Sequence, residues 1–181
     1  MKESVLAKIL LYLIYVTAFA PLIIFNDYIS PFHFGKVIIF RSIVEIMVAF
    51  YLILIWREPS YRPKMTKISW AFLAFASAFS IATATSVIPY MSFWGTLERM
   101  GGLFTFWHYF IFFIILTSIF RTEKDWLNLF KLTIFVGILS ALYGFGQRTD
   151  IQFFVGSGGR ERIFGTIGNP AFFAIFRTSL F

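Results

Sequence analysis

Long apolar runs separated by short polar segments dominate the chain. Five runs reach the roughly 20 residues that a helix needs to cross the hydrocarbon core of a bilayer. They cover residues 4–25, 36–56, 68–88, 103–120 and 126–146, and a sixth begins at Pro170. The pattern predicts an all-α fold: a polytopic transmembrane helical bundle with five complete spans and the start of a sixth.

The sixth run is too short to cross a membrane. Residues 170–181 would form about 18 Å of helix at 1.5 Å per residue, and Arg177 falls where hydrocarbon is expected. We therefore expect residues 1–181 to be a single transmembrane domain that forms the N-terminal part of a longer protein.

Composition agrees with a lipid environment. Hydrophobic residues make up 59% of the chain and charged residues 14%, whereas a soluble domain has about 25% charged residues. The net charge of +7 does not indicate nucleic-acid binding, because the basic residues lie between spans and do not gather on one soluble face. The expected partner is the lipid bilayer.

The distribution of Lys and Arg predicts the orientation. With a cytoplasmic N-terminus, nine basic residues lie on the cytoplasmic side and seven elsewhere, which agrees with the positive-inside rule. The connection over residues 57–67 holds four of the nine and one Glu. We expect a multi-pass protein of the bacterial inner (cytoplasmic) membrane, with residues 26–35, 89–102 and 147–169 on the outer side.

The third outer segment carries two arginines suited to an anion. Arg160 and Arg162 follow the glycine-rich residues 156–159 and precede a Gly-Thr-Ile-Gly-Asn-Pro turn. Guanidinium groups bind phosphate oxygens in a bidentate manner, and a following helix N-terminus adds positive dipole. The alternative is that the arginines only reach lipid headgroups and the glycines only make turns. The residues alone leave both readings open.

Three further charged residues are candidates. Arg99 follows Glu98 in the second outer segment, either as a phosphate ligand or as half of an interfacial ion pair. Arg41 and Glu45 lie four residues apart within the second span, so they share a helix face and are predicted to form an intramembrane ion pair. Such residues mark functional sites in membranes, although a structural pair near the interface explains them equally well.

The sequence shows no arrangement of histidine, cysteine or acidic residues that would predict a catalytic or metal site. His33 and His108 are isolated and are expected to be interface residues. The chain has no cysteine.

Two segments together resemble the bacterial O-antigen ligase and polymerase superfamily. The first is Phe-Trp-Gly-Thr-Leu-Glu-Arg-Met-Gly-Gly-Leu over residues 93–103. The second is Arg-Ile-Phe-Gly-Thr-Ile-Gly-Asn-Pro over residues 162–170, which is similar to the family's Arg-x-x-Gly-Thr-x-Gly-Asn-Pro signature. The predicted spans agree with the family's N-terminal half. Ala171 stands where the family commonly has Asn.

The resemblance implies a polytopic glycosyltransferase that moves a glycan from undecaprenyl pyrophosphate to an acceptor at the outer leaflet, without metal or cofactor. It implies that Arg99, Arg160 and Arg162 contact the donor phosphates or position the loops. The family's catalytic loop would lie beyond residue 181, so we assign no catalytic residue and expect the fragment to be inactive alone. Ligase, polymerase and protein glycosylation activities stay open.

Two other function classes fit the same spans. In a small transporter or channel subunit, Arg41 and Glu45 would line a substrate path. A structural membrane protein would need no ligand at all.

Overall fold

The computed structural model describes residues 4–25, 30–149 and 163–169, and these form helices and turns without a strand. The α-helices are α1 (Val5–Thr17), α2 (Phe34–Arg57), α3 (Lys67–Ala84), α4 (Pro89–Trp94), α5 (Leu103–Ile119) and α6 (Glu123–Gly146). Two short 3-10 helices, η1 (Ala20–Leu22) and η2 (Pro59–Tyr61), follow α1 and α2. The all-α prediction is confirmed for this part of the chain.

Among the described residues, four segments are long and apolar enough to span a membrane, which is consistent with a multi-pass membrane protein. They are Val5–Leu22, Phe34–Arg57, Lys67–Ala84 and Glu123–Gly146. The fourth predicted span, residues 103–120, corresponds to α5, which has 17 residues and is therefore about 25 Å long, shorter than a typical 30 Å hydrocarbon core. Five complete spans thus stay a prediction.

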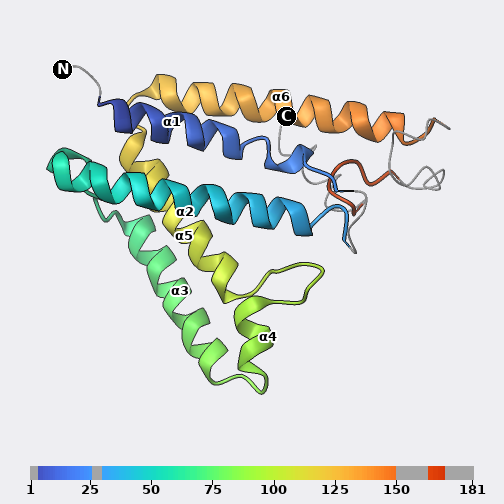
Figure 1. Cartoon of the computed structure of the whole chain (residues 1–181), viewed down its shortest axis with the longest axis horizontal. Helices are drawn as coiled ribbons and strands as arrows, with labels where there is room; N and C mark the ends of the chain where they lie inside the picture. Colours follow the sequence, from blue (N-terminus) through green and yellow to red (C-terminus); the bar gives the residue numbers. More distant parts are fainter. Residues whose placement is uncertain (1–3, 26–29, 150–162, 170–181) are drawn as a thin grey trace.

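Helices α1, α2 and α5 form the packed centre of the bundle (Figure 1). Leu10, Ile14, Met47, Leu54 and Ile115 are buried where these helices meet. Because lipid tails are as apolar as leucine, close packing rather than escape from water holds such helices together in a membrane. Helix α6 contacts η1, and the Tyr15 hydroxyl approaches the carbonyl oxygen of Asp125 at 3.4 Å.

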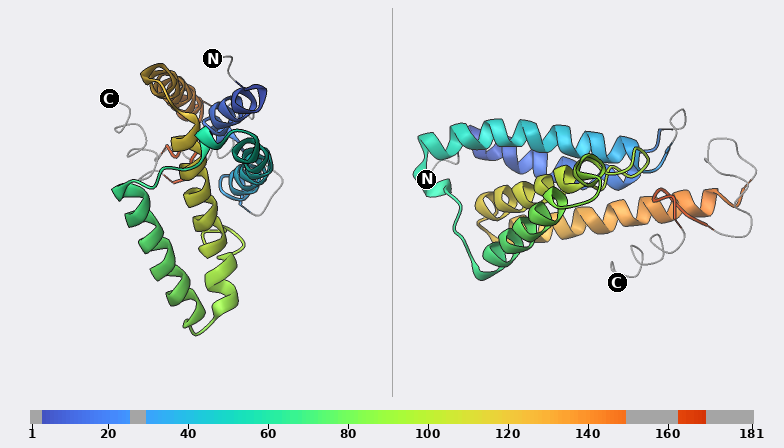
Figure 2. Two further views of the ribbon diagram at one scale, coloured as in Figure 1. Left: turned by 90° about the vertical axis from the view of Figure 1, so that its left-hand side faces the viewer. Right: turned by 90° about the horizontal axis from the view of Figure 1, so that it is seen from below.

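Helices α3 and α4 project away from this centre, as Figure 1 and the left view of Figure 2 show. Phe72 on α3 packs against Phe106, Phe110 and Phe113 of α5 with ring centroids 5.2 to 5.5 Å apart. Helix α4 falls within residues 89–102, which the sequence predicted as a loop. It begins at Pro89, a residue suited to the first turn of a helix because the missing N–H has no partner there anyway.

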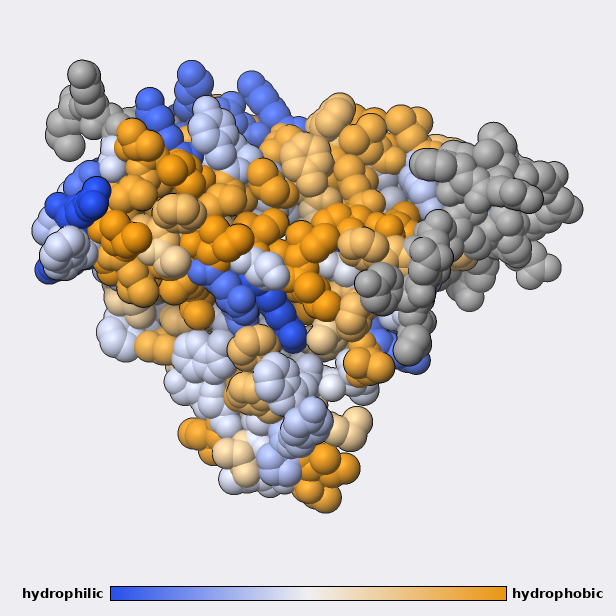
Figure 3. Space-filling model, in the orientation of Figure 1, coloured by the Kyte–Doolittle hydropathy of each residue, from blue (hydrophilic) through white to orange (hydrophobic). Residues whose placement is uncertain are grey.

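Apolar side chains cover much of the outside of the molecule. Figure 3 shows hydrophobic atoms over much of this face of the bundle, with hydrophilic atoms at the end where α2 meets α3, along the upper edge and in one patch near the middle of the face. Large exposed residues include Trp56 at 81% and Ile81 at 67% of their accessible area. A contiguous apolar surface of this extent indicates contact with lipid.

The turn between α3 and α4 lies at the tip of the projecting pair, and the other connections fall at two opposite ends (Figure 1). One end holds η1, the start of α2, residues 95–102, the end of α6 and residues 163–169 (Figure 1). The other holds η2, the start of α3 and the turn between α5 and α6. We call these the motif end and the η2 end. The motif end carries the described parts of both family-like segments.

Candidate functional site

Arg41 is the most deeply placed charged residue at the motif end, with 7% of its area exposed. Its Nε donates to Thr105 Oγ1 at 3.1 Å, and one terminal nitrogen donates to Thr105 Oγ1 and, at 2.9 Å, to the carbonyl oxygen of Met100. The guanidinium also lies 4.8 Å from the centroid of the Phe104 ring. A charge inside a membrane bundle needs such partners, and here they fix residues 95–102 to α2.

The 95–102 turn depends on glycine. Gly95 has φ +80°, and a Cβ there would meet the Gly101 nitrogen at 2.6 Å. Only glycine adopts this conformation without a steric cost. Arg99, at the tip of the turn, is exposed. The turn therefore presents the Arg99 guanidinium at the surface, while Arg41 binds the turn through the carbonyl oxygen of Met100.

The second family-like segment docks on two helices. Lys36 of α2 donates to the carbonyl oxygen of Thr166, and the Thr166 hydroxyl lies 2.7 Å from Ser140 Oγ on α6. Gln147 Oε1 accepts from the Gly165 nitrogen at 2.8 Å. Thr166 and Gln147 are buried. Residues 163–169 thus pack between α2 and the C-terminal part of α6 and are hydrogen-bonded to both sides.

Helix α2 therefore joins the two segments. Lys36 holds the second, and Arg41, five residues along the same helix, holds the first. Ring packing adds to the second contact, since the centroids of Phe32 and Phe164 lie 5.3 Å apart. Two sequence motifs some 60 residues apart are brought to one end of the bundle by one helix.

A basic cluster of His33, Lys36 and Arg99 lies at this end. Burial lowers the pKa of His33, and the positive charges of Lys36 and Arg99 lower it further. His33 is thus close enough to both cations to feel their charge and favours its neutral form. The positive side chains of Lys36 and Arg99 are the members of this cluster that would attract an anion. The sequence argument treated His33 as an interface residue and did not single out Lys36.

Arg41 and Glu45 share a face of α2, but each finds its hydrogen-bonding partner on α5. The Glu45 carboxylate lies 3.4 Å from His108 Nε2, and 61% of its side chain is exposed. His108 Nδ1 lies 2.7 Å from the carbonyl oxygen of Phe104, which requires a proton on Nδ1.

The remaining candidates, Arg160 and Arg162, lie outside the described residues. Of the three predicted phosphate-binding arginines, the structure describes Arg99.

The chain matches no family model, no curated protein and no solved structure. The resemblance to O-antigen ligases therefore rests on the two sequence segments, and these comparisons do not test it.

Proposed function

We propose that the chain is the N-terminal membrane segment of an O-antigen ligase-like glycosyltransferase. The observation that supports this most strongly is the meeting of residues 93–103 and 163–169 on α2. Segments that act on one ligand must lie close together, and Lys36 and Arg41 hold these two at the same end.

The proposed donor is a glycan linked to undecaprenyl pyrophosphate. Its transfer breaks the bond between the anomeric carbon and the pyrophosphate, and positive groups stabilise the charge on that leaving group. We assign Arg99, together with Arg160 and Arg162, to the donor phosphates. The basic cluster adds Lys36 to the same region, while Arg41 positions the turn and does not touch the donor.

The proposal places the motif end at the outer face of a bacterial inner membrane and the N-terminus in the cytoplasm. The support is the greater number of Lys and Arg residues at the η2 end, which the positive-inside rule assigns to the cytoplasm.

The transporter alternative requires Arg41 and Glu45 to line a water-filled passage. The Arg41 side chain donates its hydrogen bonds to Thr105 and to the carbonyl oxygen of Met100. The side chain of Glu45 lies on the exposed side of α2. No contact among the described residues favours a passage, so the transporter is not carried further.

A binding experiment tests the proposal. The purified chain in phosphatidylcholine nanodiscs is incubated with radiolabelled undecaprenyl pyrophosphate, and undecaprenol serves as the ligand without phosphate. We expect retention of the diphosphate only, and a drop of roughly tenfold to a hundredfold in affinity for Arg99→Ala, the worth of one charge-assisted contact.

The matched control is Arg62→Ala, which removes an exposed arginine at the η2 end and should leave the affinity unchanged. Equal retention of undecaprenol, or equal loss from both substitutions, would refute the proposal.

A further inference from the structure

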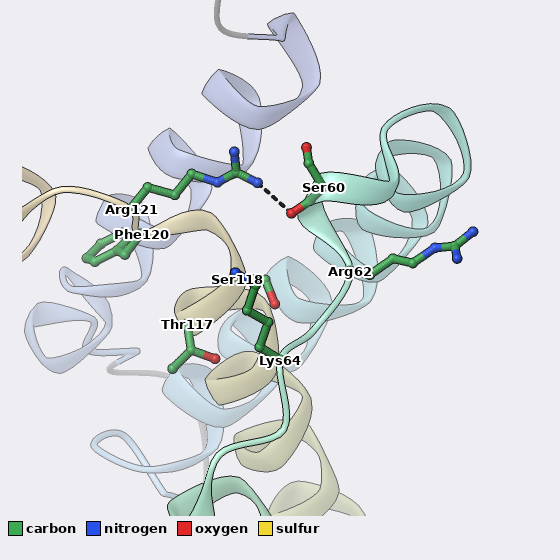
Figure 4. Close-up of a pocket in the computed structure, with 7 residues that line it drawn as sticks. All are labelled: Ser60, Arg62, Lys64, Thr117, Ser118, Phe120 and Arg121. Atoms are coloured by element: carbon green, nitrogen blue, oxygen red, sulfur yellow. Dashed lines mark hydrogen bonds between the residues drawn. The ribbon is translucent and has the colours of Figure 1, made fainter.

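A second charged site lies at the η2 end, far from the two family-like segments. A cavity of about 470 Å³ opens there between the α2–α3 connection and the end of α5. Ser60, Arg62, Lys64, Thr117, Ser118, Phe120 and Arg121 line it (Figure 4). This volume falls in the range of small-ligand sites, about 300 to 1,000 Å³.

The lining has one sign of charge. It contains three basic side chains, three hydroxyl groups and no carboxylate. In Figure 4 Lys64 runs beside Ser118 and Thr117, whereas Arg62 points away from the other lining residues. Lys64 and Arg121 are therefore the cations that face the cavity, and Arg62 is a neighbouring cation that does not.

Arg121 is held in place before any ligand arrives. Its guanidinium carbon lies 3.6 Å from the centroid of the Tyr61 ring, and one terminal nitrogen donates to the carbonyl oxygen of Ser60 at 2.8 Å. Tyr61 is itself buried, and its carbonyl oxygen accepts from the Tyr51 hydroxyl at 3.0 Å. A guanidinium fixed in this way loses little entropy when it binds an anion.

One acidic group of this turn, Asp125, is already engaged by backbone donors. Asp125 Oδ2 accepts from the backbone nitrogens of Arg121 and Thr122 at 3.2 and 3.0 Å as part of the capping box that starts α6. One of the five N–H donors of the Arg121 side chain is used by Ser60. The remaining donors are available to phosphate oxygens.

The helix ends around the cavity predict that it lies at the level of the membrane interface. It sits where α2 and α5 end and α3 and α6 begin, and α2 and α6 carry Trp56 and Trp126 near these termini. Tryptophan is enriched at the headgroup level on both sides of a membrane. Basic pockets between helices at this depth bind the headgroups of anionic lipids.

We propose that Lys64 and Arg121 bind the phosphate group of an anionic phospholipid from the surrounding leaflet. Free phosphate shares this chemistry, and the position of the cavity at the helix ends favours the lipid. The proposal concerns the end of the molecule opposite the basic cluster and does not depend on the proposed glycosyltransferase function.

Lipid retention measures this binding. The whole chain is purified from nanodiscs that contain phosphatidylcholine and phosphatidylglycerol, and native mass spectrometry counts the lipids that stay bound. We expect selective retention of phosphatidylglycerol and an affinity about fivefold lower for Lys64→Gln, the effect of one cation near an anionic surface. Lys64→Arg should restore binding, because it keeps the charge.

Arg62→Gln is the control, since it removes the same charge from the same connection without removing a group that faces the cavity. Both side chains are exposed, so neither substitution threatens folding. Equal loss with Lys64→Gln and Arg62→Gln, or equal retention of the two lipids, overturns the proposal. Inorganic phosphate should not displace the lipid; displacement would identify a solution anion as the ligand and overturn the lipid assignment.

Discussion

Replacing Thr105 by Val tests whether Arg41 holds the motif end together. The two side chains are similar in shape, so the change removes the hydroxyl group and leaves almost no cavity. Arg41 loses the acceptor that both its Nε and a terminal nitrogen use and keeps the carbonyl oxygen of Met100 at 2.9 Å. The same change removes the hydrogen bond from the Thr105 hydroxyl to the Met100 carbonyl oxygen, so it weakens the contact among all three residues.

The expected cost lies between two limits. A hydrogen bond to a charged group contributes about 1.5 to 3 kcal/mol in soluble proteins, whereas hydrogen bonds between membrane helices average about 0.6 and reach about 1.7 kcal/mol. The buried guanidinium of Arg41 has no water to replace the lost acceptor, yet it retains one partner. We therefore expect Thr105→Val to lower the free energy of unfolding by about 1 to 2 kcal/mol.

Reversible unfolding in mixed micelles, followed by helical circular dichroism, measures this loss. Thr117→Val is the matched control on the same helix. Thr117 is exposed, and its hydroxyl approaches only carbonyl oxygens of its own helix. Its replacement should change the free energy of unfolding by less than about 0.5 kcal/mol. Equal effects from the two substitutions would show that Arg41 does not depend on Thr105.

Three further predictions concern single residues. Because the pKa of His33 lies below the ordinary 6.5, the folded chain binds fewer protons at His33 than the unfolded chain does. The free energy of unfolding should therefore be highest above pH 6.5 and fall as the pH drops below that value. Unfolding measured against pH should show that His33→Gln loses this dependence. Gly95→Ala should cost about 2 kcal/mol or more in the same unfolding assay, since φ is +80° and a Cβ would clash, whereas Gly101→Ala, with nothing within 4 Å of its Cβ, should be nearly neutral. Thr122→Ala removes the N-cap of α6 and should cost about 1 kcal/mol; an unchanged unfolding midpoint would show that the cap contributes nothing.

Helix positions along the chain were largely predictable. An uninterrupted apolar run can satisfy its backbone in lipid only as a helix, so hydropathy alone predicted α2, α3 and α6 to within a few residues. The same holds for α5, which was predicted over residues 103–120 and extends over Leu103–Ile119. The end of α1 was less predictable, because it depends on turn geometry: α1 ends at Thr17 and a 3-10 turn follows. The sequence did not predict α4, because a helix of six residues that starts at Pro89 is too short to show a periodic pattern of apolar residues.

The partners of the charged residues were not predictable in the same way. Spacing of four places Arg41 and Glu45 on one face of α2, but the geometry of the folded bundle decides which groups come closer. Thr105 and His108 lie more than 60 residues away in sequence. Similarly, nothing local marks Lys36 as the residue that holds Thr166, or Gln147 as the partner of Gly165. These contacts depend on how α2, α5 and α6 pack together.

The central claim is that the motif end faces the outside of the cell. Because the chain has no cysteine, one introduced thiol reports the side of the membrane without background. Thr96→Cys lies in the exposed turn at the motif end and Ser60→Cys lies at the exposed η2 end. In intact cells a membrane-impermeant maleimide should label the chain carrying Thr96→Cys at once, and the chain carrying Ser60→Cys only after the membrane is permeabilised. Labelling of Ser60→Cys alone in intact cells would contradict the account, because the basic cluster would then face the cytoplasm, away from the proposed donor.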